Sequence, residues 1–211
     1  MNEITDTAFK KHLDNAVQFH GHLCSGQVLG VRMAMAGLRE LGIRDSRGGE
    51  GMDLVIFIEI DRCIADAIIS VTGRTPGKRS IKLMDYGKTA ATFVHTGTGK
   101  AVRVSLRPDS HEKIAEMTRR RMPDLDEKAA NIEALTVIPE KELLMTRPVH
   151  VEVRPQDRPG ESLNSTFCSS CGEMVRDMRE IVCDGKALCR PCAENKAYYE
   201  EIGERYEPAV Y

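Results

Sequence analysis

Four cysteines near the C-terminus have the residue type and spacing of metal ligands: Cys168, Cys171, Cys189 and Cys192. They form two Cys-x-x-Cys pairs separated by 17 residues. Each pair offers two thiolates from one tight turn, and two such turns complete the tetrahedral coordination that Zn²⁺ prefers. Because no coordination position is left for water or substrate, we expect a structural zinc. The alternative is two disulfides, which the metal-type spacing disfavours.

The residues around these cysteines predict a treble-clef zinc finger. Residues 174–183 and 186–188 are expected to form two short strands around Asp184-Gly185, a dipeptide that favours a tight hairpin turn. The second Cys-x-x-Cys pair should lead into a helix over residues 191–205. The remaining cysteine of this region, Cys183, is expected to be a small buried residue in the hairpin rather than a fifth ligand.

A second cluster of metal-binding residue types lies near the N-terminus, where His20, His22 and Cys24 fall within five residues. If this segment is extended, the three alternating side chains point the same way, and all three are good transition-metal ligands. Cys24 is also expected at the N-terminus of a helix, where the helix dipole favours the thiolate. The spacing alone leaves two alternatives open: a metal or reactive-thiol site, and a pair of structural histidines.

Two further segments carry candidate site residues. Cys63 and Asp66 follow a predicted buried strand at residues 54–58 and could add a thiolate and a carboxylate. Taken alone, they read equally as a packed cysteine and an ordinary helix charge. Lys78 lies in a basic loop that could bind an anionic group, and a solvated loop is the alternative.

Hydrophobic periodicity and turn residues predict an α+β core domain at residues 1–160 and the finger at residues 161–211. The expected core is a mixture of helices and antiparallel sheet. Helices are expected at residues 5–18, 25–41, 63–71, 110–121, 126–135 and 140–145. Strands are expected at residues 54–58, 81–84, 89–95, 100–106 and 148–153.

Composition narrows the function classes. No apolar run is long enough to span a bilayer, and the polar N-terminus does not resemble a signal peptide, so we expect a cytoplasmic protein. Residues 164–211 hold six lysines and arginines against nine acidic residues, a net charge of −3. Because nucleic-acid backbones attract positive charge, this balance argues against a finger that reads DNA or RNA.

Three segments together resemble the family of the E-type subunit of formylmethanofuran dehydrogenase: residues 19–26 (FHGHLCSG), Cys63-x-x-Asp66, and residues 71–78 (VTGRTPGK). The C-terminal module resembles an auxiliary zinc finger of some members. The resemblance implies an α+β domain that forms an intertwined homodimer, with a metal cleft around the His-Gly-His-x-Cys segment and Cys63. It also implies association with the molybdenum or tungsten enzyme that reduces CO₂ onto methanofuran in methanogenesis. Arg74 stands where the family often has another cysteine, which weakens a dithiol role.

The sequence therefore predicts a homodimeric protein with a structural zinc in the finger and a second metal, zinc or another transition metal, in the core. The core ligands are expected to be His20, His22, Cys24 and Cys63. If the core is catalytic, as part of an oxidoreductase, Cys24 and Asp66 are the expected catalytic groups and Lys78 binds the substrate. The alternatives are an accessory or metal-delivery protein that docks onto a larger molybdenum or tungsten enzyme, and, less favoured, a nucleic-acid-binding regulator.

Overall fold

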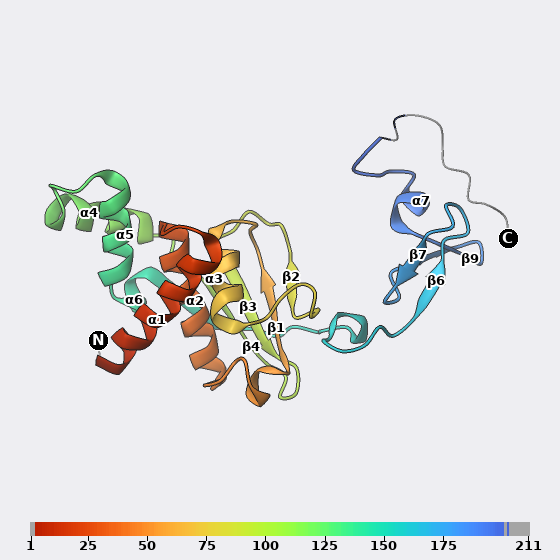
Figure 1. The fold of residues 1–211 in the computed structure, drawn as a ribbon, viewed down its shortest axis with the longest axis horizontal. Helices are drawn as coiled ribbons and strands as arrows, with labels where there is room; N and C mark the ends of the chain where they lie inside the picture. Colours follow the sequence, from red (N-terminus) through yellow and green to blue (C-terminus); the bar gives the residue numbers. More distant parts are fainter. Residues whose placement is uncertain (1–2, 201, 203–211) are drawn as a thin grey trace. The chain divides into compact units, whose positions relative to one another are not determined.

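The computed structural model describes residues 3–200 and 202. The chain divides into two compact units, a core unit at Met1–Gly160 and a finger unit at Glu161–Tyr211, and each is described by itself. The core unit is an α+β structure with a mixed sheet, and the finger unit is a pair of small hairpins followed by one short helix (Figure 1). Among the described residues, no helix combines the length and the apolar character needed to cross a membrane.

The core unit is organised around one five-stranded sheet with the strand order β2-β1-β3-β4-β5. Only β1 and β2 pair in parallel, and the other neighbours are antiparallel. The strands are β1 (Leu54–Ile58), β2 (Ile81–Leu83), β3 (Ala90–His95), β4 (Lys100–Leu106) and β5 (Leu144–Pro148). In this arrangement the end of β1, the start of β3 and the end of β4 meet at the same edge of the sheet.

Three helices cover one face of this sheet (Figure 1). They are α1 (Glu3–His20), α2 (Ser25–Leu41) and α3 (Cys63–Thr72). Alternate residues of the strands, such as Ile56 and Phe93, point into the hydrophobic core beneath these helices and are fully buried. The intervening residues face the opposite side of the sheet because side chains alternate along a strand.

The remaining core helices are α4 (Ser110–Arg121), α5 (Glu127–Val137) and α6 (Glu140–Leu143). A buried arginine of α2 holds α5 in place. The Arg32 guanidinium donates hydrogen bonds to the carbonyl oxygens of Leu135 at 2.5 Å and Ile138 at 2.7 Å. These carbonyls lie at the C-terminal end of α5, where backbone acceptors lack partners within the helix. Arg32 therefore acts as an internal cap, although burial lowers its pKa.

Two sequence predictions in the core unit are corrected by the structure. The final strand is Leu144–Pro148 rather than residues 148–153. Pro148 lacks an N–H and ends the pairing with β4, and beyond it Val149, Val151 and Val153 instead pack against the sheet face that the helices leave open. Helix α1 also continues two residues beyond its predicted end and includes His20.

The finger unit contains two hairpins and one short helix. Strand β6 (Ser165–Phe167) pairs with β7 (Met174–Arg176), and β8 (Ile181–Cys183) pairs with β9 (Lys186–Leu188). The predicted single strand at residues 174–183 is therefore two strands that belong to different hairpins. Asp184 and Gly185 both have positive φ, as a two-residue type I′ turn requires, so the hairpin prediction is confirmed.

The helix of the finger unit is shorter than predicted. Helix α7 spans Arg190–Glu194, and Asn195 ends it in the left-handed conformation with φ of 48°. The described residues beyond Asn195 are not helical, and the last part of the predicted helix lies outside the described residues. Cys168 is the only buried residue among the described residues of this unit. The finger unit therefore lacks a hydrophobic core of the ordinary kind.

Candidate metal centres

The four C-terminal cysteines form one cluster, which we call the finger cluster: Cys168, Cys171, Cys189 and Cys192. Their sulfur atoms all lie within 4.8 Å of one another, a spacing that a single metal ion can bridge. The Sγ atoms of Cys171 and Cys189, from different Cys-x-x-Cys pairs, are 3.8 Å apart. The cluster joins the two hairpins and α7, because one pair follows β6 and the other begins α7.

Backbone N–H groups favour the thiolate in this cluster. The amides of Cys171 and Cys189 are directed at the Cys168 sulfur, and with the Ser170 amide at 3.4 Å they lower the pKa of Cys168 to about 6. Gly172 allows the return of the chain after the first pair, since it has φ of 76° and its N–H donates to the Cys168 carbonyl at 2.9 Å. The first turn is therefore arranged to present a negatively charged sulfur.

A second cluster, the core cluster, consists of His20, Cys24 and Cys63, with one ligand atom from each lying within 4.8 Å of the others. The three residues come from three helix ends. His20 is the last residue of α1, Cys24 is the N-cap of α2, and Cys63 is the first residue of α3. Residues far apart in the sequence are thus brought together where these helices converge.

The imidazole of His20 has the environment of a metal ligand. Its Nδ1 lies 2.7 Å from Oδ2 of Asp66, while Nε2 is buried and has no hydrogen-bond partner among the described residues. A carboxylate on one nitrogen typically fixes the ring of a metal-bound histidine, so that the other nitrogen faces the ion. The residues present therefore fit a metal ion, because a buried acceptor without a partner is otherwise costly.

Two glycines of α2 allow the close approach of α2 and α3 that creates the core cluster. A Cβ on Gly26 would lie 2.7 Å from Cβ of Cys63, and a Cβ on Gly30 would lie 2.6 Å from Cβ of Ala67. These glycines are one helical turn apart and face α3. Any larger residue at either position would separate the two helices and move Cys63 away from Cys24.

Neighbouring groups also shape the thiol of Cys63. Burial and the adjacent Cys24 thiol raise the pKa of Cys63. The side chain of Gln27 is fully buried, and its Nε2 donates to the Cys63 carbonyl at 2.7 Å. This bond links the first turn of α2 to the first turn of α3. The hydrogen bond therefore fixes the separation of the two helix ends on which the thiols sit.

Two of the predicted core residues lie outside the core cluster. The extended arrangement of residues 20–24 is wrong, because His20 ends a helix and Gly21 follows with φ of 97°. His22 is exposed, and its ring centroid lies 4.6 Å from that of His20. Lys78 is exposed in the loop between α3 and β2, where its N–H donates to Oγ1 of Thr75 at 3.3 Å. The roles predicted for these two residues stay predictions.

Arg74, which replaces the family's frequent cysteine, has a structural setting. It is 9% exposed, and its Nη1 donates to the Gly51 carbonyl at 2.8 Å. The positions that sequence reasoning missed are Gly26, Gly30 and Gln27. Their only signal is the spacing of two glycines one turn apart within a helix that begins at a predicted ligand.

Comparison with known proteins places these features in a family. A "Probable S-adenosyl-L-methionine-binding protein" of Archaeoglobus fulgidus is 31% identical, over 89% of this chain and 53% of that protein. The chain thus spans about half the length of this curated relative.

The crystal structure of an FmdE-like protein from Syntrophus aciditrophicus, named after tungsten formylmethanofuran dehydrogenase, shares the fold. Its TM-score is 0.59 at 18% identity, covering 90% of this chain and 95% of that chain. The family model described as "FmdE, Molybdenum formylmethanofuran dehydrogenase operon" matches residues 19–146, a range that contains the whole core cluster and ends before the finger cluster. The chain is therefore a member of the FmdE family that carries an additional four-cysteine cluster at its C-terminus.

Proposed function

We propose that this protein is a two-metal member of the FmdE family, with a structural zinc in the finger cluster and a second transition-metal ion in the core cluster. The observation that carries the core site is the His20 imidazole. Its Nδ1 is bonded to Asp66, and its buried Nε2 has no protein partner in the described part of the chain. Two thiols complete a set of three ligands of the kind that zinc and similar ions prefer.

The two sites are proposed to do different work. Four thiolates fill a tetrahedral site, so the finger metal has no position for a substrate and serves the fold. Three ligands leave a position open in the core cluster. A metal held there would supply Lewis-acid polarisation of a small carbonyl or carboxylate group. Cys24 contributes its thiol from the N-terminus of α2, where the helix dipole favours negative charge.

Asp66 and Lys78 complete the proposed catalytic arrangement. Asp66 accepts a hydrogen bond from the His20 Nδ1–H, which orients the ring and keeps the proton at that nitrogen. Its side chain is 43% exposed, so Asp66 can also exchange protons with solvent. The Lys78 ammonium is proposed to attract the anionic end of a substrate from its exposed loop. We further propose that the protein acts as a homodimer.

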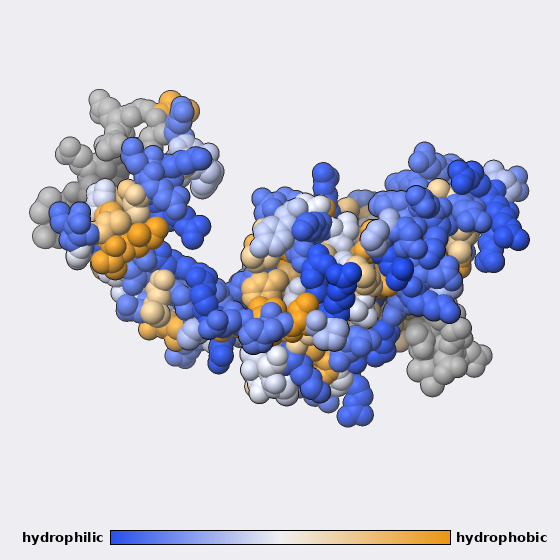
Figure 2. All heavy atoms as spheres, turned by 180° about the vertical axis from the view of Figure 1, so that it is seen from behind, coloured by the Kyte–Doolittle hydropathy of each residue, from blue (hydrophilic) through white to orange (hydrophobic). Residues whose placement is uncertain are grey.

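The alternative function is an accessory or metal-delivery protein that docks onto a larger molybdenum or tungsten enzyme through the finger. The observation that favours it is the apolar surface of the finger unit (Figure 2). Phe167 is 62% exposed and Val182 is 68% exposed. Exposed apolar side chains on a small metal-bound module are suited to protein contacts. Purification of the protein from its native host separates the two functions, because a docking protein would elute with a large partner.

S-adenosyl-L-methionine is a further candidate ligand, since the Archaeoglobus relative is named for binding it. The chain covers only part of that relative, so the binding region of that protein need not have a counterpart here. Calorimetric titration of the metal-loaded protein with S-adenosyl-L-methionine tests this directly. Saturable heat would assign the ligand, and its absence would leave the metal site as the shared feature.

The proposed function is tested first by elemental analysis of metal content per chain. We expect about two ions in the wild type and about one in either Cys171→Ser or the double variant Cys24→Ala with Cys63→Ala. Cys183→Ser is a matched control, because Cys183 belongs to neither cluster, and it should keep both ions. Unchanged metal content in the core double variant would show that the core cluster does not hold an ion.

A further inference from the structure

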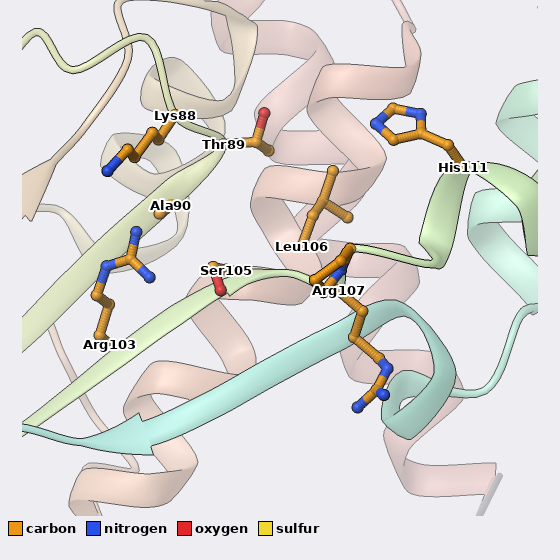
Figure 3. A pocket seen from close by; sticks show the side chains of 9 residues that line it. Lys88, Thr89, Ala90, Arg103, Ser105, Leu106, Arg107 and His111 are labelled. Atoms are coloured by element: carbon orange, nitrogen blue, oxygen red, sulfur yellow. The ribbon is translucent and has the colours of Figure 1, made fainter.

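A pocket of about 350 Å³ opens at the sheet edge where β3 begins and β4 ends (Figure 3). Its polar lining consists of Lys88, Thr89, Arg103, Ser105, Arg107 and His111. None of these residues belongs to the core cluster. Four of the six are basic residue types, and small apolar surface from Ala90 and Leu106 completes the wall. The volume falls in the range of sites for small ligands.

One buried carboxylate holds two of the basic side chains in position. Glu59 is 6% exposed and accepts hydrogen bonds from Nε and Nη2 of Arg103, each at 2.7 Å. This two-pronged contact fixes the guanidinium plane and leaves Nη1 free of any hydrogen bond among the described residues. The backbone carbonyl of Glu59 also accepts the N–H of Lys88 at 3.1 Å, which anchors the start of β3. Arg103 and Lys88 are therefore presented to the pocket by the same residue.

The positive charge of the pocket is only partly balanced by protein carboxylates. Glu59 neutralises Arg103, and Asp109 is shared between Arg107 at 3.1 Å and Lys113 at 2.9 Å. Lys88 has no acidic partner in the described part of the chain; its ammonium lies 5.8 Å from the centre of the Tyr86 ring. His111 likewise has no polar partner among the residues described. The pocket and its immediate neighbours thus carry more positive than negative charge.

Two hydroxyl groups add donors at the same place. Neither Oγ1 of Thr89 nor Oγ of Ser105 makes a hydrogen bond to another described residue, although Ser105 is only 7% exposed. A hydroxyl can donate to an oxyanion that also receives charged N–H groups. Surface lysines alone would not provide this combination of a concave wall, fixed guanidinium and unused hydroxyls.

We propose that this pocket is a binding site for a small organic anion that carries a carboxylate or phosphate group. The oxyanion is bound by Lys88 and Arg107, with Arg103 Nη1 and the Ser105 and Thr89 hydroxyls as further donors. The short carbon part of the ligand lies against Ala90 and Leu106. The site is separate from the two metal clusters and does not depend on the function proposed for them.

The test is titration of the full-length, metal-loaded protein with two probes, inorganic phosphate and succinate, followed by amide NMR shifts and calorimetry. We expect at least one probe to saturate and to shift the amides of Thr89 and Ser105. The probe that binds more tightly distinguishes a phosphate ligand from a carboxylate ligand. The double variant Lys88→Gln with His111→Gln should weaken binding by about tenfold or more, since it removes two of the unpaired basic groups.

Lys78→Gln and Lys100→Gln are matched controls that remove a lysine outside the pocket, and each should change affinity less than about twofold. The core double variant Cys24→Ala with Cys63→Ala should bind the probe as the wild type does, which separates this site from the core cluster. The proposal is overturned if neither probe saturates by about 10 mM, a concentration well above useful affinity. It is also overturned if the control variants weaken binding as much as the pocket variant.

Discussion

The two cysteine clusters are built in opposite ways. The finger cluster takes all of its ligands from two tight turns between residues 168 and 192, in a unit whose only buried described residue is one of the ligands, Cys168. The core cluster takes its ligands from the ends of three helices packed on a sheet with a large apolar core. We conclude that the finger fold depends on its metal, whereas the core fold creates a metal site that it does not need for stability.

The sharpest test of this difference is loss of one finger ligand. In Cys189→Ser, the finger unit should lose its metal and its folded structure together, because no apolar core remains to hold the two hairpins. Amide NMR should show collapse of the dispersed resonances of residues 165–194. The resonances of the core unit should keep their positions.

The same experiment has a counterpart in the core. The variant Cys24→Ala should lose core metal but keep a folded core unit, with its thermal unfolding shifted by only a few degrees. A finger that stays folded after chelation of its metal would contradict the comparison. So would a core unit that unfolds when its metal is removed by the same chelator.

Helix spacing is the next expected effect. Gly30→Ala would place a Cβ 2.6 Å from Cβ of Ala67 and 2.8 Å from the Ile64 carbonyl, so α2 and α3 must move apart. We expect a loss of about 1–3 kcal/mol in the free energy of unfolding of the core unit, despite the better helix propensity of alanine. Urea unfolding measures this change.

Gly77→Ala is the matched control for that variant, because nothing lies within 4 Å of the Cβ position and the residue is in an exposed loop. It should leave the free energy of unfolding within about 0.5 kcal/mol of the wild type. Gly30→Ala should also weaken metal binding at the core cluster but not at the finger cluster. Equal stability of the two alanine variants would show that α2 and α3 tolerate a wider spacing.

Removal of the Asp66 carboxylate tests how the core cluster orients its ligand. In Asp66→Ala the His20 ring loses its 2.7 Å partner, and metal affinity of the core cluster should fall by about 10- to 100-fold with the fold intact. Competition with a chromophoric chelator measures this affinity. Asp61→Ala removes a nearby exposed carboxylate as a control. The same affinity loss in both variants would assign the effect to general charge rather than to the His20 contact.

Local signals were sufficient to predict most of the elements. Helix α2 spans Ser25–Leu41 as expected, and Gly42 follows it with φ of 75°, because the periodicity and the glycine stop act within a few residues. The Asp184-Gly185 turn is local in the same sense. The finger cluster is equally local, which explains why cysteine spacing alone brought its ligands together correctly.

Features that depend on long-range packing could not be predicted in this way. The sequence does not show that Arg32 in α2 caps α5, since their contact joins residues about a hundred positions apart. It does not pair Asp66 with His20 by spacing, and it places His22 beside Cys24 only on the assumption of an extended segment. The basic pocket combines Lys88 with residues after β4, which strand pairing alone brings together.

The smallest expected effect concerns His22, and it decides how many ligands the core cluster has. His22 is exposed, and only His20, Cys24 and Cys63 form the close group, so His22→Ala should change core metal affinity by less than about threefold. His20→Ala, measured beside it, should abolish the site. The ring of His22 nevertheless lies 4.6 Å from that of His20 and follows Gly21, whose positive φ lets the chain turn. An affinity loss as large as that of His20→Ala would therefore mean that this loop closes over the ion. The core cluster would then be a closed four-ligand site like the finger, without an open position for a substrate.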